Sequence, residues 1–419
     1  MSKKKNGCSG CFSFFMFLFI VIIACVIIVS IPDSDNVTND SDNTDTSAVT
    51  DKVGATDAPA LEEVIGDDEY LYYYRQLDSA GKEIYEKLLS SVRAGNDSCT
   101  FNEIDYAAYG PSVDDAISAL TYDHPLYFWL TNGYKTEYLD RDGTKNDYMK
   151  FHFDYYSYWN FTMSPDKYIN ELNAEVDKVC TLAKQYTSPV DQAIFVHDYL
   201  IKNAEYDHDT LAEARKTIHA ASSEYIYSAY GCLVNKKCVC SGYAEAFQLI
   251  MNKLGVNTTV VIGDAGGPHE WNMIELEGEN YYIDVTWDDH DRKNDSGVFI
   301  YTNDSDYEYM CITTEELRKT HTPDALMFSP PNCLSTRYNY FVYNGYFLWD
   351  YSFSEFNRIV TEQAAEKKII TVKLANRIEF NEAIEDIITN KNGFNIPALS
   401  KGYKYVTDDN HYTIKFILE

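Results

Sequence analysis

Residues 236–247 read "KKCVCSGYAEAF", and two cysteines in this stretch, Cys238 and Cys240, lie one residue apart. Apolar residues then recur at helical spacing up to Leu254, and Gly255 ends the run. The Ser-Gly pair after Cys240 is small enough for the chain to turn tightly into a helix. We therefore predict a helix that begins at or just after Cys240.

The position of Cys240 at a helix start makes it the better nucleophile of the two cysteines. Unpaired N–H groups and the helix dipole favour a thiolate there. The same N–H groups could stabilise an oxyanion formed when the sulfur attacks a carbonyl. Cys238 lies roughly 6–7 Å further back along an extended segment and misses most of this field.

A histidine and an acid follow in "HEWNMIELEGENYYIDVTWDD", residues 269–289. Alternating apolar and polar residues predict a β-hairpin that turns at Gly278–Glu279, with His269 opening the first strand and Asp284 within the second. With the cysteine, they supply a nucleophile, a base and an orienting group. Each residue alone would most often be structural, and their joint occurrence in this order favours catalysis.

The predicted hairpin register leaves the identity of the acid open. A turn centred on Gly278–Glu279 pairs Asp284 with Met273, about 13 Å along the strand from His269. The same register places Asp288 opposite His269. Either a bulge or longer loop shifts the pairing, or Asp288 is the partner.

Residues 188 to 290 resemble the transglutaminase-like superfamily, in the branch found in bacterial surface proteins and kyphoscoliosis-type peptidases. The motifs that carry the resemblance are Cys-x-Gly-Tyr-Ala, His-x-Trp-Asn and Asp-x-Thr-Trp. The resemblance implies that Cys240 is the nucleophile, His269 the base and Asp284 the orienting acid, with Asp288 as second choice. It also implies an α+β papain-like fold in which the cysteine helix packs on an antiparallel sheet.

Composition and spacing argue against nucleic-acid, metal and cofactor functions. The 419 residues include 65 Asp+Glu and only 35 Lys+Arg, for a net charge of −30, whereas a phosphate backbone is bound by basic surface. The acidic run "DDHDRKND" at 288–295 lacks the glycine and terminal glutamate of an EF-hand loop, and we expect a solvated loop. No cysteine and histidine spacing predicts zinc. We expect no metal and no cofactor.

The cysteines do not form a clear disulfide framework. Of ten, seven follow the N-terminal segment, and an odd number outside the cell leaves at least one thiol unpaired or paired between chains. A redox pair of Cys238 and Cys240 is a weaker alternative, because Cys-x-Cys disulfides are strained and no thioredoxin-like pattern surrounds them.

The N-terminus predicts a membrane anchor. Three lysines precede an uncharged run at 12–31, long enough to cross a bilayer, and the positive-inside rule places the lysines in the cytoplasm. A cleaved signal peptide and a lipoprotein signal cut before Cys25 are the alternatives, and all three export the remainder. We expect a single-pass protein of the cell membrane with an extracellular catalytic domain.

The chain divides into six predicted parts. In order they are a cytoplasmic tail (1–11), a transmembrane helix (12–31), a disordered acidic linker (32–68), an N-terminal helical or mixed region (69–187), the transglutaminase-like catalytic domain (188–330) and a C-terminal β-hairpin with a small α/β region (331–419). Residues 115–134 are expected to form a helix ending at Asn132–Gly133, and the C-terminal hairpin to turn at Asn344–Gly345. His124 and His197 are expected to be hydrogen-bonded structural residues.

These observations favour a cysteine acyl-transfer enzyme that works through a thioester. Water as acceptor would make it a peptidase or amidase, and a lysine amine would make it a protein cross-linker. An anchored extracellular protein favours hydrolysis of a peptide or protein substrate, cell-wall peptides included. The alternative from another class is a non-catalytic binding or scaffolding module, against which the intact Cys240, His269 and Asp284 set argues. Trp271, Asn272 and Trp287 are expected to pack around this set.

Overall fold

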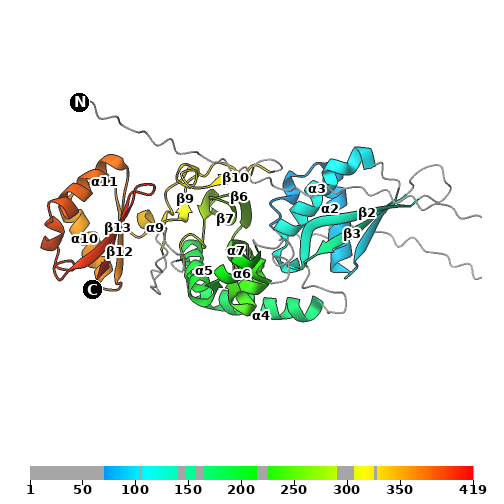
Figure 1. Ribbon diagram of the computed structural model, residues 1–419, viewed down its shortest axis with the longest axis horizontal. Coiled ribbons are helices and arrows are strands. Elements are labelled where there is room, and N and C mark those ends of the chain that lie inside the picture. The colour runs from blue at the N-terminus through cyan, green and yellow to red at the C-terminus, as the bar shows by residue number, and fades with distance from the viewer. Residues whose placement is uncertain are drawn as a thin grey trace, which may run out of the picture. The chain divides into compact units, whose positions relative to one another are not determined.

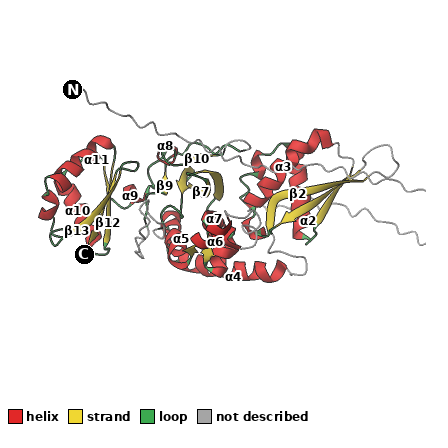
Figure 2. Cartoon of the chain, in the orientation of Figure 1, coloured by secondary structure: helices red, strands yellow, loops and turns green. Residues whose placement is uncertain are grey.

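The computed structural model describes residues 70–102, 106–139, 148–156, 165–214, 225–289, 306–324 and 328–418. Helices and mainly antiparallel sheets make up these residues (Figure 2). The predicted tail, membrane span and linker, residues 1–68, lie outside them, as does most of the acidic run at 288–295. Among the helices that the structure describes, none is both long and apolar enough to cross a membrane.

The N-terminal region, predicted to be mainly helical, also contains an antiparallel sheet. Its strands, in spatial order, are β1 (Ser98–Asn102), β3 (Tyr148–Tyr155) and β2 (Leu130–Leu139). Helices α2 (Ser79–Arg93) and α3 (Tyr106–Asp123) accompany this sheet (Figure 1), after the short η1 (Tyr74–Gln76). Asp78 caps α2 by accepting a hydrogen bond from the Gly81 N–H group.

The helix expected over 115–134 is correct only in its first half. Helix α3 ends at Asp123 because Pro125 cannot continue it and opens the 3₁₀ turn η2 (Pro125–Tyr127). Asn132–Gly133 lies within β2, at an irregularity between Leu130 and Tyr134. The Asn-Gly pair therefore lies at an irregular point of a strand and not at the end of a helix.

The central region begins with a group of helices, several of which contact the cysteine helix. They are α4 (Pro165–Ala183), α5 (Pro189–Asn203), α6 (His208–Ala214), η3 (Tyr225–Tyr227) and η4 (Gly231–Asn235). Ser188 caps α5, and Pro189 occupies its first position, where no N–H group is needed. Strand β5 (Lys237–Cys238) pairs with β4 (Glu205–Tyr206), and α7 (Cys240–Lys253) follows one residue later.

A five-stranded antiparallel sheet packs against α7, as predicted (Figure 1). Its strands, in spatial order, are β10 (Thr322–Pro323), β6 (Thr258–Asp264), β7 (Pro268–Leu276), β8 (Glu279–Ile283) and β9 (Met310–Ile312). One face, including Ile274 and Ile283, joins the core around α7. The other face, including Trp271 and Met273, packs in a separate cluster with Leu317 from α8 (Thr314–Leu317).

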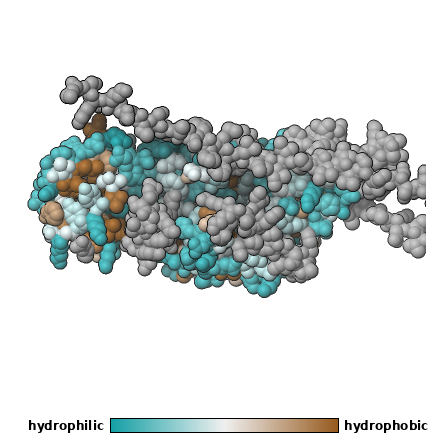
Figure 3. All heavy atoms as spheres, viewed as in Figure 1, coloured by the Kyte–Doolittle hydropathy of each residue, from teal (hydrophilic) through white to brown (hydrophobic). Residues whose placement is uncertain are grey.

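The C-terminal region forms a four-stranded sheet with its own core. The strands, in spatial order, are β11 (Phe347–Leu348), β12 (Ile369–Leu374), β14 (Thr413–Leu418) and β13 (Tyr403–Asp408). The helices are α9 (Tyr340–Tyr343), α10 (Phe353–Ala364), α11 (Arg377–Ala383), η5 (Ile384–Thr389) and η6 (Asn392–Asn395). Hydrophobic patches interrupt its hydrophilic surface in Figure 3, and Trp349 and Ile378 are among its exposed apolar side chains.

The hairpin expected at Asn344–Gly345 is wrong. The residues before this turn form the short helix α9, and β11 after it pairs in parallel with β12. An Asn-Gly turn indicates a hairpin only where extended segments flank it on both sides.

Candidate active site

Cys240 is the first residue of α7, as the sequence predicts, and its side chain is half-buried. The chain reaches this position through a close approach at Gly242. A Cβ atom on Gly242 would lie 2.5 Å from the Cys238 Cβ atom and 2.8 Å from the carbonyl oxygen of Ser228. Only glycine therefore lets the first turn of α7 pack so tightly.

The structure brings the three predicted site residues together. His269 lies near the start of β7, and its Nε2 atom is 2.6 Å from Oδ2 of Asp284. The Cys240 side chain lies close enough to the same imidazole to help raise its pKa. Because Nε2 faces Asp284, the Nδ1 atom remains for Cys240. The His269 side chain is 9% exposed and that of Asp284 is 1% exposed, so water screens this pair poorly.

The actual hairpin register explains how Asp284 reaches His269. The turn lies at Glu277–Gly278, where both residues have positive φ, and Asn272 pairs with Ile283. The predicted turn was one residue too late. Strand β8 ends at Ile283, so Asp284 is the first residue beyond the ladder and the strand-distance argument does not apply to it. The Trp287 N–H group donates to Asp284 Oδ1 at 3.0 Å and fixes the carboxylate.

Asp288, the second choice for the acid, has a different partner. Its Oδ2 atom lies 3.2 Å from Nε2 of His197, and neither side chain is exposed. The Tyr309 N–H group also donates to this carboxylate. Asp288 as the partner of His269 is therefore wrong. His197 is hydrogen-bonded and buried, as predicted, and so is His124, whose Nε2 atom lies 3.0 Å from the Tyr85 hydroxyl.

Local electrostatics favour a charged imidazole beside Asp284. Burial alone would lower the pKa of His269, but the charge and hydrogen bond of Asp284, followed by those of Cys240, raise the pKa to about 10. Burial would raise the pKa of Asp284, but His269 and then His321 hold it well below its usual range. At neutral pH the pair is an imidazolium and a carboxylate.

Cys238 lies in an environment that keeps its thiol protonated. It is fully buried, and burial raises its pKa well above the usual value, with the neighbouring Cys232 side chain adding to the effect. All seven cysteines among the described residues are free, so the Cys238 and Cys240 pair is not a disulfide in this structure. Cys240 remains the better nucleophile of the two.

His321 is a functional candidate that the sequence reasoning missed. Its Nε2 atom lies 3.0 Å from Asp284 Oδ2, the same oxygen that contacts His269. It lies just before β10, a two-residue strand that pairs with the free edge of β6. His321 is 37 residues from Asp284 and belongs to none of the recognised motifs. Only the folded topology brings the two together.

Two groups of described residues could in principle hold a metal ion: His269, Asp284 and His321, and Glu308, Asp408 and His411. In the first group both imidazoles are already hydrogen-bonded to Asp284. In the second, the ammonium group of Lys415 acts on Glu308, which disfavours a second cation. We assign a metal to neither group.

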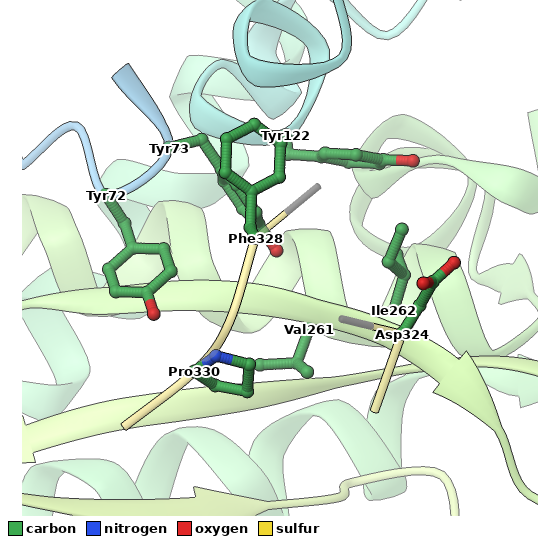
Figure 4. A pocket seen from close by; sticks show the side chains of 8 residues that line it. All are labelled: Tyr72, Tyr73, Tyr122, Val261, Ile262, Asp324, Phe328 and Pro330. Atoms are coloured by element: carbon green, nitrogen blue, oxygen red, sulfur yellow. The ribbon is translucent and has the colours of Figure 1, made fainter. Parts of the chain in front are cut away.

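A separate pocket lies beside β6 and does not include the three site residues (Figure 4). The sticks in Figure 4 show tyrosine rings from the N-terminal region facing the strand. The pocket is lined by Tyr72, Tyr73, Tyr122, Val261, Ile262, Asp324, Phe328 and Pro330. Ile262 pairs with Glu270, the residue after His269, so the pocket lies on the strands that carry the site.

Comparison with known proteins identifies a family for the region that contains this site. Residues 180–290 match the model of the transglutaminase-like superfamily, a range that contains Cys240, His269 and Asp284. No curated protein matches the chain.

Three solved structures resemble the chain over part of its length. The structure of a TGase is 14% identical in sequence, and the match covers 53% of this chain and 58% of the TGase chain, with a TM-score of 0.28. A provisionally assigned cysteine protease from Cytophaga hutchinsonii is 14% identical over 38% and 63%, with a TM-score of 0.21. A provisionally assigned protease from Parabacteroides distasonis is 10% identical over 36% and 35%, with a TM-score of 0.20. The chain spans less than two thirds of each structure.

Proposed function

Residues 180–290 belong to the transglutaminase-like superfamily, and on that premise we propose that the chain is a cysteine acyl-transfer enzyme. Cys240 is the nucleophile, His269 the general base and acid, and Asp284 the group that orients the imidazole. The observation that carries the proposal is the close pair of His269 and Asp284, 2.6 Å apart, beside Cys240 at the start of α7.

The geometry suits attack on an amide carbonyl. The Cys240 sulfur bonds to the carbonyl carbon, and the oxyanion is stabilised by the first N–H groups of α7. His269 gives its proton to the leaving nitrogen, the C–N bond breaks, and a thioester on Cys240 remains. His269 then takes a proton from the acceptor, which attacks the thioester and expels Cys240 as a thiolate, so that the starting thiolate and imidazolium are restored. Asp284 stays ionised throughout and keeps the imidazole in place.

Hydrolysis is the outcome that we propose, with a peptide or protein as substrate and cell-wall peptides included. It is supported by the expectation from the sequence that residues 12–31 form a membrane anchor, with the catalytic region outside the membrane next to such peptides. Cross-linking through a lysine amine uses the same three residues. Incubation of the thioester with a primary amine, followed by mass analysis of the products, separates the two outcomes.

Alkylation of the full-length protein by iodoacetamide across pH tests the nucleophile. Peptide mapping identifies the cysteine that reacts, and His269→Ala is the matched control. We expect Cys240 to react rapidly below pH 7 and to lose this reactivity without His269. If Cys240 reacts as an ordinary thiol with a pKa of about 8.5, the enzyme proposal fails. A binding or scaffolding module would then be favoured.

A further inference from the structure

We infer that His321 is a positioning residue for the reaction and fixes Asp284 in the orientation that His269 requires. This inference rests on the proposed function. The oxygen Oδ2 of Asp284 lies between two imidazoles, 2.6 Å from Nε2 of His269 and 3.0 Å from Nε2 of His321. Cys240 acts on the first of these imidazoles, His269, whereas the second, His321, is an additional partner of the carboxylate.

The hydrogen bonds around His321 determine which of its nitrogens carries a proton. The Tyr309 hydroxyl donates to Thr320 Oγ1 at 3.1 Å, so Thr320 has its own proton left to give. Its nearest acceptor is Nδ1 of His321 at 2.8 Å, closer than the Leu317 carbonyl at 3.4 Å. With Nδ1 as an acceptor, Nε2 of His321 carries the proton and donates it to Asp284.

The surroundings prevent the His321 ring from turning away. Its side chain is completely buried, and three aromatic rings lie against it. The ring centroids of Trp287, Trp271 and Tyr309 are 4.6, 5.0 and 5.3 Å from that of His321. A hydrogen bond in such a dry setting is stronger than one in water.

Both oxygens of Asp284 are consequently held. Oδ1 accepts from the Trp287 N–H group, and Oδ2 accepts from His321. The carboxylate plane is fixed independently of His269, so this hydrogen-bond acceptor does not reorganise as the imidazole loses and regains its proton. Among the described residues, loss of the His321 donor would leave His269 as the one side-chain partner of Oδ2.

The test compares His321→Leu with His321→Gln in the full-length protein, using the rate of iodoacetamide alkylation of Cys240 across pH. Leucine fills a similar volume without a donor, whereas the glutamine amide can donate from a position near Nε2. For His321→Leu we expect alkylation at pH 6 to fall about tenfold and its onset to move to higher pH, as for loss of one hydrogen bond to a charged group. His321→Gln should stay within about twofold of the parent.

The outcomes separate this inference from the proposed function. A parent protein with an ordinary thiol profile contradicts the proposed function itself. If Cys240 of the parent is activated and its alkylation profile is unchanged in His321→Leu, only the role of His321 is contradicted. An equal loss of alkylation rate in His321→Leu and His321→Gln also contradicts that role, because it would indicate packing alone. If His321→Leu does not fold, Thr320→Val removes the donor to Nδ1 and should move the alkylation onset in the same direction. An unmoved onset in that variant overturns the inference.

Discussion

Asp284 and Asp288 lie four residues apart in sequence but contact different histidines. Asp284 contacts His269, and Asp288 contacts His197. The first histidine is partly accessible and contacts Cys240, whereas the second is fully buried within α5. Two carboxylates in one short segment thus serve separate purposes, which makes them a matched pair for mutation.

Replacing each carboxylate with an amide should separate activity from stability. Asp284→Asn is expected to abolish rapid alkylation of Cys240 at pH 6, because the imidazolium of His269 loses its anion. Asp288→Asn should leave that reactivity intact but lower the free energy of unfolding by about 2 kcal/mol, because buried His197 loses one charged hydrogen-bond partner and keeps only the Asp198 carboxylate. Urea unfolding and alkylation rates on both variants check this. The reverse pattern would make Asp288 the catalytic acid.

The pair of His269 and Asp284 should stabilise the fold over a defined pH range. His269 has a raised pKa of about 10, so its contribution is complete below its unfolded pKa of about 6.5 and is lost as pH rises through 10. Asp284 has a lowered pKa, so its contribution is complete above its unfolded pKa of about 3.9 and is lost in stronger acid.

The free energy that His269→Gln removes should therefore be larger at pH 5.5 than at pH 10.5. Urea unfolding of parent and variant at both pH values measures it, and the comparison cancels other groups that titrate in alkali. An equal difference at both values would mean that His269 is not charged in the folded protein.

Gly263 should tolerate no larger residue. It pairs with His269 in the ladder between β6 and β7. A Cβ atom on Gly263 would lie 2.2 Å from the Thr322 carbonyl oxygen and 2.7 Å from the Trp271 ring. We expect Gly263→Ala to push β10 from β6 and to cost about 3 kcal/mol of stability. Gly133→Ala, which meets only side-chain atoms at 3.1 Å or more, is the control. Thermal unfolding of the two variants decides, and equal melting temperatures would contradict the packing argument.

A buried ion pair joins the C-terminal sheet to α8. The ammonium of Lys373 lies 2.5 Å from Oε1 of Glu316, and their side chains are 4% and 17% exposed. Its geometry is that of an ion pair and not of a regular hydrogen bond. Lys373→Met should lower the free energy of unfolding by about 3 kcal/mol, since Glu316 loses its counter-charge.

The double variant Lys373→Met with Glu316→Gln should recover part of the loss from Lys373→Met, because no buried charge is then unpaired. Urea unfolding of the single and double variants measures both effects. If the single variant unfolds like the parent, the pair contributes nothing to stability.

Local signals in the sequence were sufficient for the elements that carry the nucleophile and the base. The apolar spacing and Gly255 define α7, and the alternation from His269 to Leu276 defines β7. The hairpin turn was predicted one residue late because Gly278 fits either turn position. A shift of one residue decides which acid lies near His269, and Asp284 was selected only through the resemblance to a family.

The sequence did not predict contacts that depend on the tertiary structure. His321 reaches Asp284 because β10 extends the sheet beyond β6, and a two-residue strand has no periodic signal. Pro125 and the short helix α9 overrode patterns that favoured a longer helix and a hairpin. The division of the chain at residues 187 and 330 and the catalytic roles remain predictions.

The β13–β14 hairpin lies against the segment that carries Tyr309. Lys415 pairs with Asp306, Thr413 donates to Glu308, and the His411 ring is 4.7 Å from that of Tyr309. The carbonyl of Tyr309, in turn, accepts the backbone N–H of Asp284. The wall behind the acid is thus built partly from the last residues of the chain. A minimal working enzyme would therefore need far more of the polypeptide than residues 180–290. A fragment limited to those residues would keep Cys240, His269 and Asp284 but lose the segments that pack behind Asp284.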